Sequence, residues 1–273
     1  MRVTLRLAWK SLGRLPIHYH PAVQAAIYHT LEPSLAAFIH DQGIRYQARQ
    51  FRLFTFSRLM GPYELSRDKQ WIQFTGDSQL VVASPLNSLL QSLARRLLDK
   101  PVFRVGPSEA NITEINAQKT PLVEEPVIRV KTLSPIVAYN TMHRADERKY
   151  TLYRAPDEPE FSRLLGENLQ HKALALAGWS GDFGSAASSQ PFTVSAVSSR
   201  RHLLKYRDII VKGYSGMFII SGDPALLRLG IDSGFGSKNA QGFGCVARMP
   251  VTNAARKENR HVAGHAGVGK KLS

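Results

Sequence analysis

Residues 234–244 read Gly-Phe-Gly-Ser-Lys-Asn-Ala-Gln-Gly-Phe-Gly and form the most specific pattern of the chain, two Gly-Phe-Gly triplets around five residues. Its glycines are Gly234, Gly236, Gly242 and Gly244. Glycine adopts positive φ and lets the backbone approach another chain closely. Successive N–H groups could therefore converge on phosphate oxygens, while Lys238 supplies positive charge. The alternative is a tight glycine turn into a last strand, Phe243 to Arg248.

The sequence before this segment begins with a strand and continues as an alternation of helices and strands. Val3, Leu5 and Leu7 alternate with polar residues, which is typical of a half-buried strand. The apolar spacing then predicts helices over 21–31, 33–42 and 86–97, and strands over 51–56, 70–75, 79–83 and 102–105. This order is that of a ferredoxin-like unit, a sheet with helices on one face.

A second set of elements begins at Val127. It comprises predicted strands over 127–139, 149–153, 191–197 and 203–220, a helix over 160–176 and a short helix after Asp223. We place the linker between the sets at 106–126, where prolines interrupt polar sequence. The prediction is an α+β chain of two tandem ferredoxin-like domains, 1–115 and 116–250, followed by a basic, disordered tail, 251–273.

The composition favours a polyanionic partner. Thirty-six Lys and Arg stand against 21 Asp and Glu, a formal net charge of +15. The single cysteine, Cys245, excludes disulfides within the chain and cysteine-based zinc sites. No export signal and no apolar stretch of about 18 residues is present, so we expect a soluble, cytoplasmic protein without membrane contact.

Several patches resemble one family of nucleases. They are the glycine-rich segment, Ile-Tyr-His-Thr-Leu at 27–31, Phe-Ile-His-Asp at 38–41, Arg-Leu-Phe-Thr-Phe-Ser at 52–57 and Thr-Leu-Ser-Pro-Ile at 132–136. In order and spacing they resemble the archaeal-type branch of the CRISPR-associated endoribonucleases that process precursor repeat RNA, members of the RAMP superfamily. The resemblance implies two RRM-related, ferredoxin-like domains side by side, with CRISPR repeat RNA bound along the basic face between them.

The resemblance also implies a catalytic set. Tyr28, His40 and Arg52 match positions at which that branch carries a tyrosine, a histidine and a lysine. Metal-independent RNA cleavage needs a base, an acid and a cation that stabilises the phosphorane. Arginine stays protonated, so we expect His40 and Tyr28 to be the acid–base pair and Arg52 the electrostatic stabiliser. The rival histidines are His18, His20 and His29.

Two basic segments are candidates for RNA contact. Arg45 and Arg49 lie in residues 42–63, which contain aromatic side chains and no acid, a combination suited to single-stranded RNA. A predicted hairpin carries the second set, Arg200, Arg201, Lys205 and Arg207. Solvated surface arginines are the alternative in both cases, and the phenylalanines of the first segment are expected mostly in the core.

The leading hypothesis is a metal-independent endoribonuclease that cuts CRISPR precursor transcripts, leaving 5′-hydroxyl and 2′,3′-cyclic phosphate ends. The first alternative is a non-catalytic member of the family that retains guide RNA or scaffolds an effector complex. The second is an unrelated RRM-type RNA-binding protein, against which the glycine-rich segment argues. Effector-complex subunits and a second copy of the chain are further candidate partners, and no cofactor or metal is expected.

Overall fold

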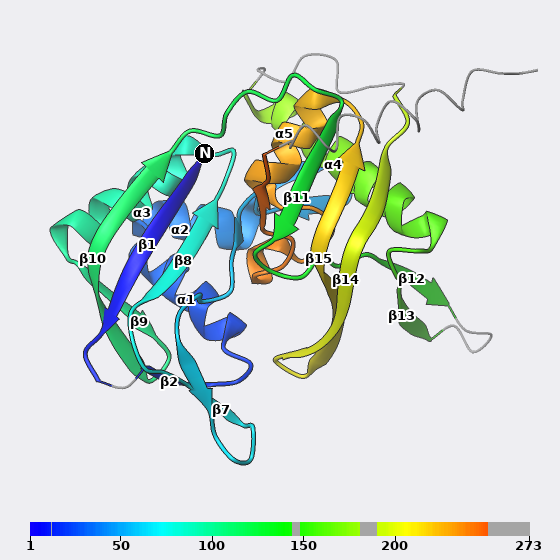
Figure 1. Ribbon diagram of the computed structural model, residues 1–273. Coiled ribbons are helices and arrows are strands. Elements are labelled where there is room, and N and C mark those ends of the chain that lie inside the picture. Colours follow the sequence, from blue (N-terminus) through cyan, green and yellow to red (C-terminus); the bar gives the residue numbers. More distant parts are fainter. Residues whose placement is uncertain (12, 144–147, 181–189, 251–273) are drawn as a thin grey trace, which may run out of the picture.

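The computed structural model is built on two larger antiparallel sheets that lie next to each other, each with helices packed on one face, and has three smaller sheets besides them in the described residues (Figure 1). It describes residues 1–11, 13–143, 148–180 and 190–250. The predicted tail, 251–273, lies outside the described residues. No helix in these ranges is long and apolar enough to span a membrane.

The first unit is built around strand β1 (Arg2–Trp9). Its sheet has the strand order β5-β8-β1-β10-β9. The other strands are β5 (Thr55–Phe56), β8 (Ser78–Ala83), β9 (Val102–Val105) and β10 (Ser108–Gln118). Helices α1 (His20–Thr30) and α3 (Asn87–Asp99) complete the β-α-β-β-α-β order of a ferredoxin-like fold.

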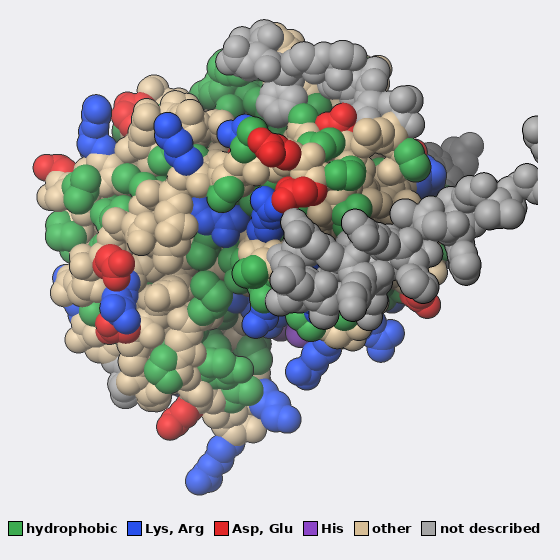
Figure 2. Space-filling model, turned by 45° about the horizontal axis from the view of Figure 1, so that its top comes forward, with side chains coloured by type: hydrophobic (Ala, Val, Ile, Leu, Met, Phe, Trp, Pro, Cys, Tyr) green, Lys and Arg blue, Asp and Glu red, His purple; other side chains and the backbone are tan. Residues whose placement is uncertain are grey.

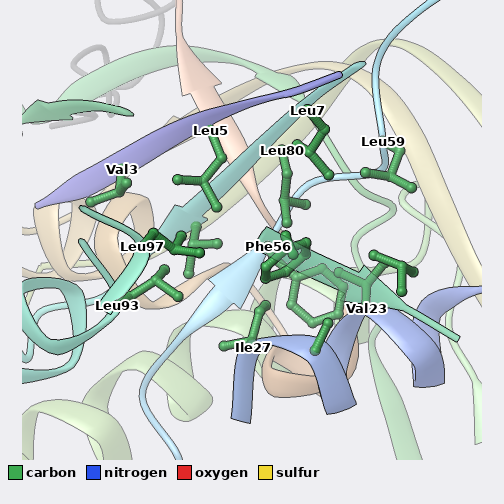
Figure 3. Close-up of a cluster of buried hydrophobic side chains, with 14 of the residues drawn as sticks. Val3, Leu5, Leu7, Val23, Ile27, Phe56, Leu59, Leu80, Leu93 and Leu97 are labelled. Atoms are coloured by element: carbon green, nitrogen blue, oxygen red, sulfur yellow. The ribbon is translucent and has the colours of Figure 1, made fainter. Parts of the chain in front are cut away.

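Apolar periodicity explains how these elements pack. Val3, Leu5 and Leu7 of β1 are completely buried, as the alternation predicts. Figure 3 shows that they face Val23 and Ile27, four residues apart on α1, across the core. Each such side chain contributes about 1.5–3 kcal/mol through its burial. The strand and helix predictions for this core are therefore confirmed.

The predicted linker is wrong in its first part. Residues Ser108–Gln118 form β10, which pairs with the whole of β1, from Arg2 opposite Gln118 to Trp9 opposite Ala110. One face of β10 meets solvent, so few of its residues are apolar, and only Ser108, Ala110 and Ile112 are buried. The strand also runs past residue 115, where we placed the end of the first domain.

Residues 44–56 depart from the prediction of a single strand over 51–56. They form β3 (Ile44–Tyr46), β4 (Arg49–Phe51) and β5, with Leu53 at a φ of 48° between the last two. A break there turns the chain away from the hairpin. Smaller strands are β2 (Gly13–Pro16), β6 (Tyr63–Leu65) and β7 (Trp71–Phe74), which form a separate sheet.

The predicted helix over 33–42 is present in two parts. Helix α2 (Pro33–Ala37) continues without interruption into a π-helix, Phe38–Gln42. The π-helix ends at Gly43, whose φ of 55° is the positive value expected of a terminating glycine. Ile39 is buried and anchors this segment in the core of the first unit, whereas the next side chain, His40, is exposed.

The second unit repeats the same order of elements. Its sheet runs β14-β15-β11-β16. The strands are β11 (Val127–Thr132), β14 (Thr193–Tyr206), β15 (Ile209–Ser221) and β16 (Val246–Arg248), with helices α4 (Pro159–Ser180) and α5 (Pro224–Ser233). A small hairpin, β12 (Tyr139–His143) and β13 (Lys149–Tyr153), is inserted before α4. The prediction of two tandem ferredoxin-like units is thus confirmed.

The long β14–β15 hairpin links the two units. We predicted a gap between strands 191–197 and 203–220, but β14 is continuous to Tyr206. At the tip, the Tyr206 hydroxyl donates a hydrogen bond to Oε1 of Gln24 on α1, and the Lys205 N–H donates to Nδ1 of His18 at 3.3 Å. The basic end of the hairpin therefore lies on the first unit.

Candidate RNA-cleavage site

A hollow of about 470 Å³, here called the central cavity, is formed by residues of the β4–β5 segment, helix α4, the hairpin tip and the glycine-rich loop. Its lining includes His40, Arg49, Arg52, Lys172, Arg207 and Lys238. On the face shown in Figure 2, basic and acidic side chains are interspersed, so net charge alone does not locate a binding site there. The central cavity differs from this mixed surface, because every charged side chain that lines it is Lys or Arg and the only other ionisable base is a histidine.

The three side chains predicted to be catalytic lie together at the edge of this cavity. The rings of Tyr28, on α1, and His40, on the π-helix, meet edge to face with centroids 5.3 Å apart. Nη2 of Arg52 donates to the backbone carbonyl of His40 at 2.9 Å. Three separate segments thus converge on one point, and the bond from Arg52 fixes the backbone that carries the histidine.

His40 has the exposure and orientation of a proton-transfer group. Its side chain is 61% exposed, and its Nδ1 lies 2.6 Å from Oδ1 of Asp41. A carboxylate at Nδ1 favours the tautomer with the proton on that atom, which leaves Nε2 to accept a proton. No described residue hydrogen-bonds Nε2. The ring also lines a second, smaller hollow of about 370 Å³ that it shares with Tyr28 and Arg207.

Tyr28 is held in the protonated state. Its hydroxyl oxygen is buried, and the Arg52 guanidinium lies next to it. Burial raises the pKa of Tyr28 to about 12, against an opposing effect from the nearby Arg52 guanidinium. At neutral pH this hydroxyl is therefore a proton donor.

The rival histidines do not line the central cavity, although His29 lines the smaller hollow together with Tyr28 and His40. His20 is fully buried and stacks on Phe243 with ring centroids 5.5 Å apart, and burial lowers its pKa to about 3. It is a neutral packing residue beneath the glycine-rich loop. His18 and His29 are exposed, and neither lines the central cavity. Of the four candidates, only His40 does.

The glycine-rich loop is packed more tightly than the sequence suggested. All four of its glycines are buried and have positive φ. A Cβ on Gly242 would lie 2.5 Å from the Phe56 ring and 2.7 Å from that of His20. The N–H of Gly242 donates to the carbonyl of Asn239, and that of Gly244 to the carbonyl of Pro135. The amides of Gly242 and Gly244 are therefore committed within the protein and do not face a phosphate. Convergence of the other loop N–H groups on phosphate stays a prediction.

What the loop presents to the central cavity is the segment 237–241. Within it, Lys238 has a left-handed backbone, with a φ of 62°, and its Nζ lies 5.3 Å from the centroid of the Tyr139 ring. Burial lowers the pKa of Lys238. The glycines thus act by shaping the loop, and Lys238 carries its positive charge into the cavity.

Of the other side chains predicted to contact RNA, some line the central cavity and some lie outside it. Arg49 and Arg207 line the central cavity, whereas Arg45 does not. The hairpin residues Arg200, Arg201 and Lys205 are exposed along β14, away from the cavity lining. Phe54 and Phe56 are completely buried, as expected for core residues.

Lys172 of α4 is a cavity residue that the sequence analysis missed. It is 2% exposed, and its Nζ donates to the carbonyl of Gly234 and to Oδ1 of Asn239, both at 2.7 Å. Burial lowers its pKa to about 7. Its position between Leu169 and Leu176, on the apolar stripe of the helix, was the available signal, because a lone lysine on such a stripe must find partners inside the protein.

The pKa of Lys172 predicts a pH dependence of stability. Its pKa is about 7 in the folded protein and near its usual 10.5 in the unfolded chain, so between these values only the unfolded chain binds the proton. The residue's contribution to the free energy of unfolding therefore rises with pH over this range. Lys172→Met should abolish that rise and, at pH 9, lower stability by about 1–3 kcal/mol through two unsatisfied acceptors.

Thermal unfolding at pH 7 and pH 9 measures this effect. Lys131→Met, which changes an exposed lysine on β11, serves as the matched control and should leave the pH dependence intact. A gap between the melting temperatures of the native chain and Lys172→Met that does not widen between the two pH values would contradict the assignment.

The described residues contain no group of three or more His, Cys, Asp or Glu side chains placed to hold a metal ion.

Sequence comparison supplies the family. Residues 14–116 match the family described as CRISPR-associated protein Cas6, N-terminal, and residues 117–248 match CRISPR associated protein Cas6, C-terminal. The CRISPR-associated endoribonuclease Cas6 1 of Methanocaldococcus jannaschii is 28% identical over 261 residues, 94% of this chain and 96% of its own. The endoribonuclease-like protein Cas6nc of Pyrococcus horikoshii is 23% identical over 252 residues, 90% and 98% of the two chains.

Structural comparison agrees with this result. A solved structure described as an RAMP protein binding different RNA substrates superposes with a TM-score of 0.74, at 22% identity, over 92% of this chain and 100% of its own. Two ferredoxin-like units with a glycine-rich loop before the last strand therefore form a RAMP-like fold. Among proteins of that fold, the chain belongs to the Cas6 family of CRISPR-associated proteins.

Proposed function

We propose that this chain is an endoribonuclease that cuts CRISPR repeat RNA and so releases guide RNA units from precursor transcripts. The observation that carries the proposal is the contact of His40 and Tyr28, with Arg52 bonded to the His40 backbone, at the edge of a basic cavity. The M. jannaschii relative, similar over nearly the whole chain, is named as a CRISPR-associated endoribonuclease. The RAMP protein of similar fold is described as binding RNA.

The proposed reaction needs no metal ion. Nε2 of His40 takes the proton of the ribose 2′-hydroxyl, and the 2′-oxygen attacks the adjacent phosphorus. As the bond from phosphorus to the 5′-oxygen breaks, the Tyr28 hydroxyl donates its proton to that oxygen. Arg52 supplies the positive charge that stabilises the phosphorane. The products are a 2′,3′-cyclic phosphate and a 5′-hydroxyl end.

The remaining basic side chains of the central cavity suit phosphate binding on either side of the cut. Arg49, Arg207 and Lys238 come from three different elements, so they can bind successive phosphates of a strand that passes through the cavity. Arg45 and the hairpin residues Arg200, Arg201 and Lys205 are proposed to contact more distant parts of the repeat. In this proposal the loop glycines act only by shaping the loop.

A non-catalytic role in retaining RNA is the second candidate. Arg52 cannot replace the proton donor that a lysine would provide. Tyr28, with its pKa raised to about 12, is a weak acid. The P. horikoshii relative carries the name endoribonuclease-like, which leaves activity open for that protein.

The test is incubation of the purified chain, in excess EDTA, with repeat RNA from its own genome. A matched RNA carries a 2′-deoxynucleotide before the cut site. A single cut in the first RNA only, with cyclic phosphate and 5′-hydroxyl ends, is the expected result. Binding of both RNAs without any cut would favour the second candidate and reject the first.

A further inference from the structure

A third hollow, of about 810 Å³, lies between α1, α3 and β9, on the side of α1 away from the central cavity. We call it the α1–α3 hollow. Its floor is apolar, with Ala22, Ala25 and Ala26 of α1 and Val102 of β9. None of the residues assigned above to cleavage or RNA contact lines it.

The three hollows are neighbours. The central cavity and the smaller hollow at Tyr28 share the residues Gln24, His40 and Arg207 in their linings. The smaller hollow and the α1–α3 hollow share Ala25 and His29. The three hollows therefore form a row across α1, and Tyr28 and His40 line the middle one. Since a helix with its side chains is about 10–12 Å wide, a strand crosses it within a few nucleotides.

The α1–α3 hollow, at the far end of this row, contains more basic than acidic side chains. The α1–α3 hollow contains four Lys and Arg side chains, Lys10, Arg96, Lys100 and Arg104, and two acids, Asp99 and Glu109. Hydrogen bonds from Lys10 and then Arg104 lower the pKa of Glu109 to about 2, so Glu109 stays ionised and its charge is compensated by these two cations. Neither Arg96 nor Lys100 forms an ion pair with any residue in the described ranges.

These features match the chemistry of a single RNA strand. Arg96 and Lys100, which form no ion pair in the described ranges, can bind phosphates, and the alanine and valine side chains can pack against ribose and base faces. Since the α1–α3 hollow adjoins the smaller hollow that Tyr28 and His40 line, its position suits nucleotides close to the cut.

We propose that the α1–α3 hollow binds the single-stranded RNA that flanks the scissile phosphate on one side, with phosphates at Arg96 and Lys100. The proposal rests on the function proposed above, and it assigns the hollow a role in holding the substrate along the row of hollows that includes His40. The strand enters or leaves the central cavity by crossing α1.

The test compares two double variants of equal charge change. Arg96→Gln with Lys100→Gln removes both cations from the hollow. Arg95→Gln with Lys119→Gln removes two exposed cations that do not line it, one of them from the same helix. Binding is measured with repeat RNA carrying the 2′-deoxynucleotide at the cut site, either with both flanks or trimmed to end at the cut site from the 5′ or the 3′ side.

The Arg96/Lys100 variant should bind the RNA with both flanks about 10-fold or more weakly. The slope of log affinity against log salt should also fall by about 1.4, for two lost single-strand phosphate contacts. One of the two trimmed RNAs should bind this variant and the native chain equally, and that RNA identifies the flank. Equal weakening in the Arg95/Lys119 variant, or weakening that survives both trims, would overturn the proposal.

The binding measurement does not depend on cleavage. A native chain that fails to cut unmodified RNA would reject the proposed function, while the comparison with the 2′-deoxy RNA would still decide whether the hollow holds a flank. A native chain that cuts, with no difference between the two double variants, would reject the hollow alone.

Discussion

Replacement of His40 by alanine is expected to slow cleavage of repeat RNA by about 10²–10⁴-fold, the usual contribution of a positioned acid–base group. The reason is geometric. Asp41 lies at Nδ1, so Nε2 is the atom that can take a proton, and the exposed ring reaches both hollows at the cleavage site. Single-turnover cleavage with enzyme in excess measures the chemical step directly.

Binding distinguishes this loss from a general disturbance of the site. The His40 side chain makes no hydrogen bond to any described residue other than Asp41, so His40→Ala should bind the 2′-deoxy RNA within about 3-fold of the native chain, a cost of under 1 kcal/mol. His18→Ala is the matched control: it removes a histidine that lines neither hollow at the site and loses only the 3.3 Å hydrogen bond from the Lys205 N–H, so it should cut within about 3-fold of the native rate, under 1 kcal/mol. Native cleavage by His40→Ala would show that the histidine takes no part in catalysis.

The sequence predicted those parts of the fold in which apolar periodicity and burial coincide. The alternation at Val3, Leu5 and Leu7 and the spacing of Val23 and Ile27 required no knowledge of partners, because each set has one face on the core. β10 was missed because its outer face is solvated and its pairing with β1 joins residues about a hundred positions apart. Long-range pairing leaves little local trace in a polar strand.

The candidate site was less predictable from local sequence patterns than the core was. The residues Tyr28, His40 and Arg52 were selected through the family resemblance, since nothing in their spacing shows that a π-helix and a break at Leu53 bring them together. The glycine-rich loop was recognised as special, but its sequence did not show that all four of its glycines are buried. Only the buried environment at Gly242 shows that close packing, rather than contact with phosphate, requires a glycine there.

Removal of the Arg52 charge is the second large expected effect. Arg52→Ala should reduce the cleavage rate by about 10²–10³-fold, the range found when a group that stabilises developing negative charge is removed. The guanidinium lines the central cavity, lies close to the Tyr28 hydroxyl and bonds to the His40 carbonyl. In the proposed reaction it therefore acts on the phosphorane and on the position of His40 together.

Two further variants separate these roles. Arg52→Lys keeps the charge but loses the planar fork that reaches both neighbours, whereas Arg52→Gln keeps a hydrogen-bond donor and loses the charge. If charge stabilisation dominates, Arg52→Lys should recover a large part of the native single-turnover rate and Arg52→Gln should remain as slow as Arg52→Ala. The opposite order would show that Arg52 serves mainly to hold the π-helix. The cation at the phosphorane would then come from another basic residue of the central cavity, such as Arg207 or Lys238.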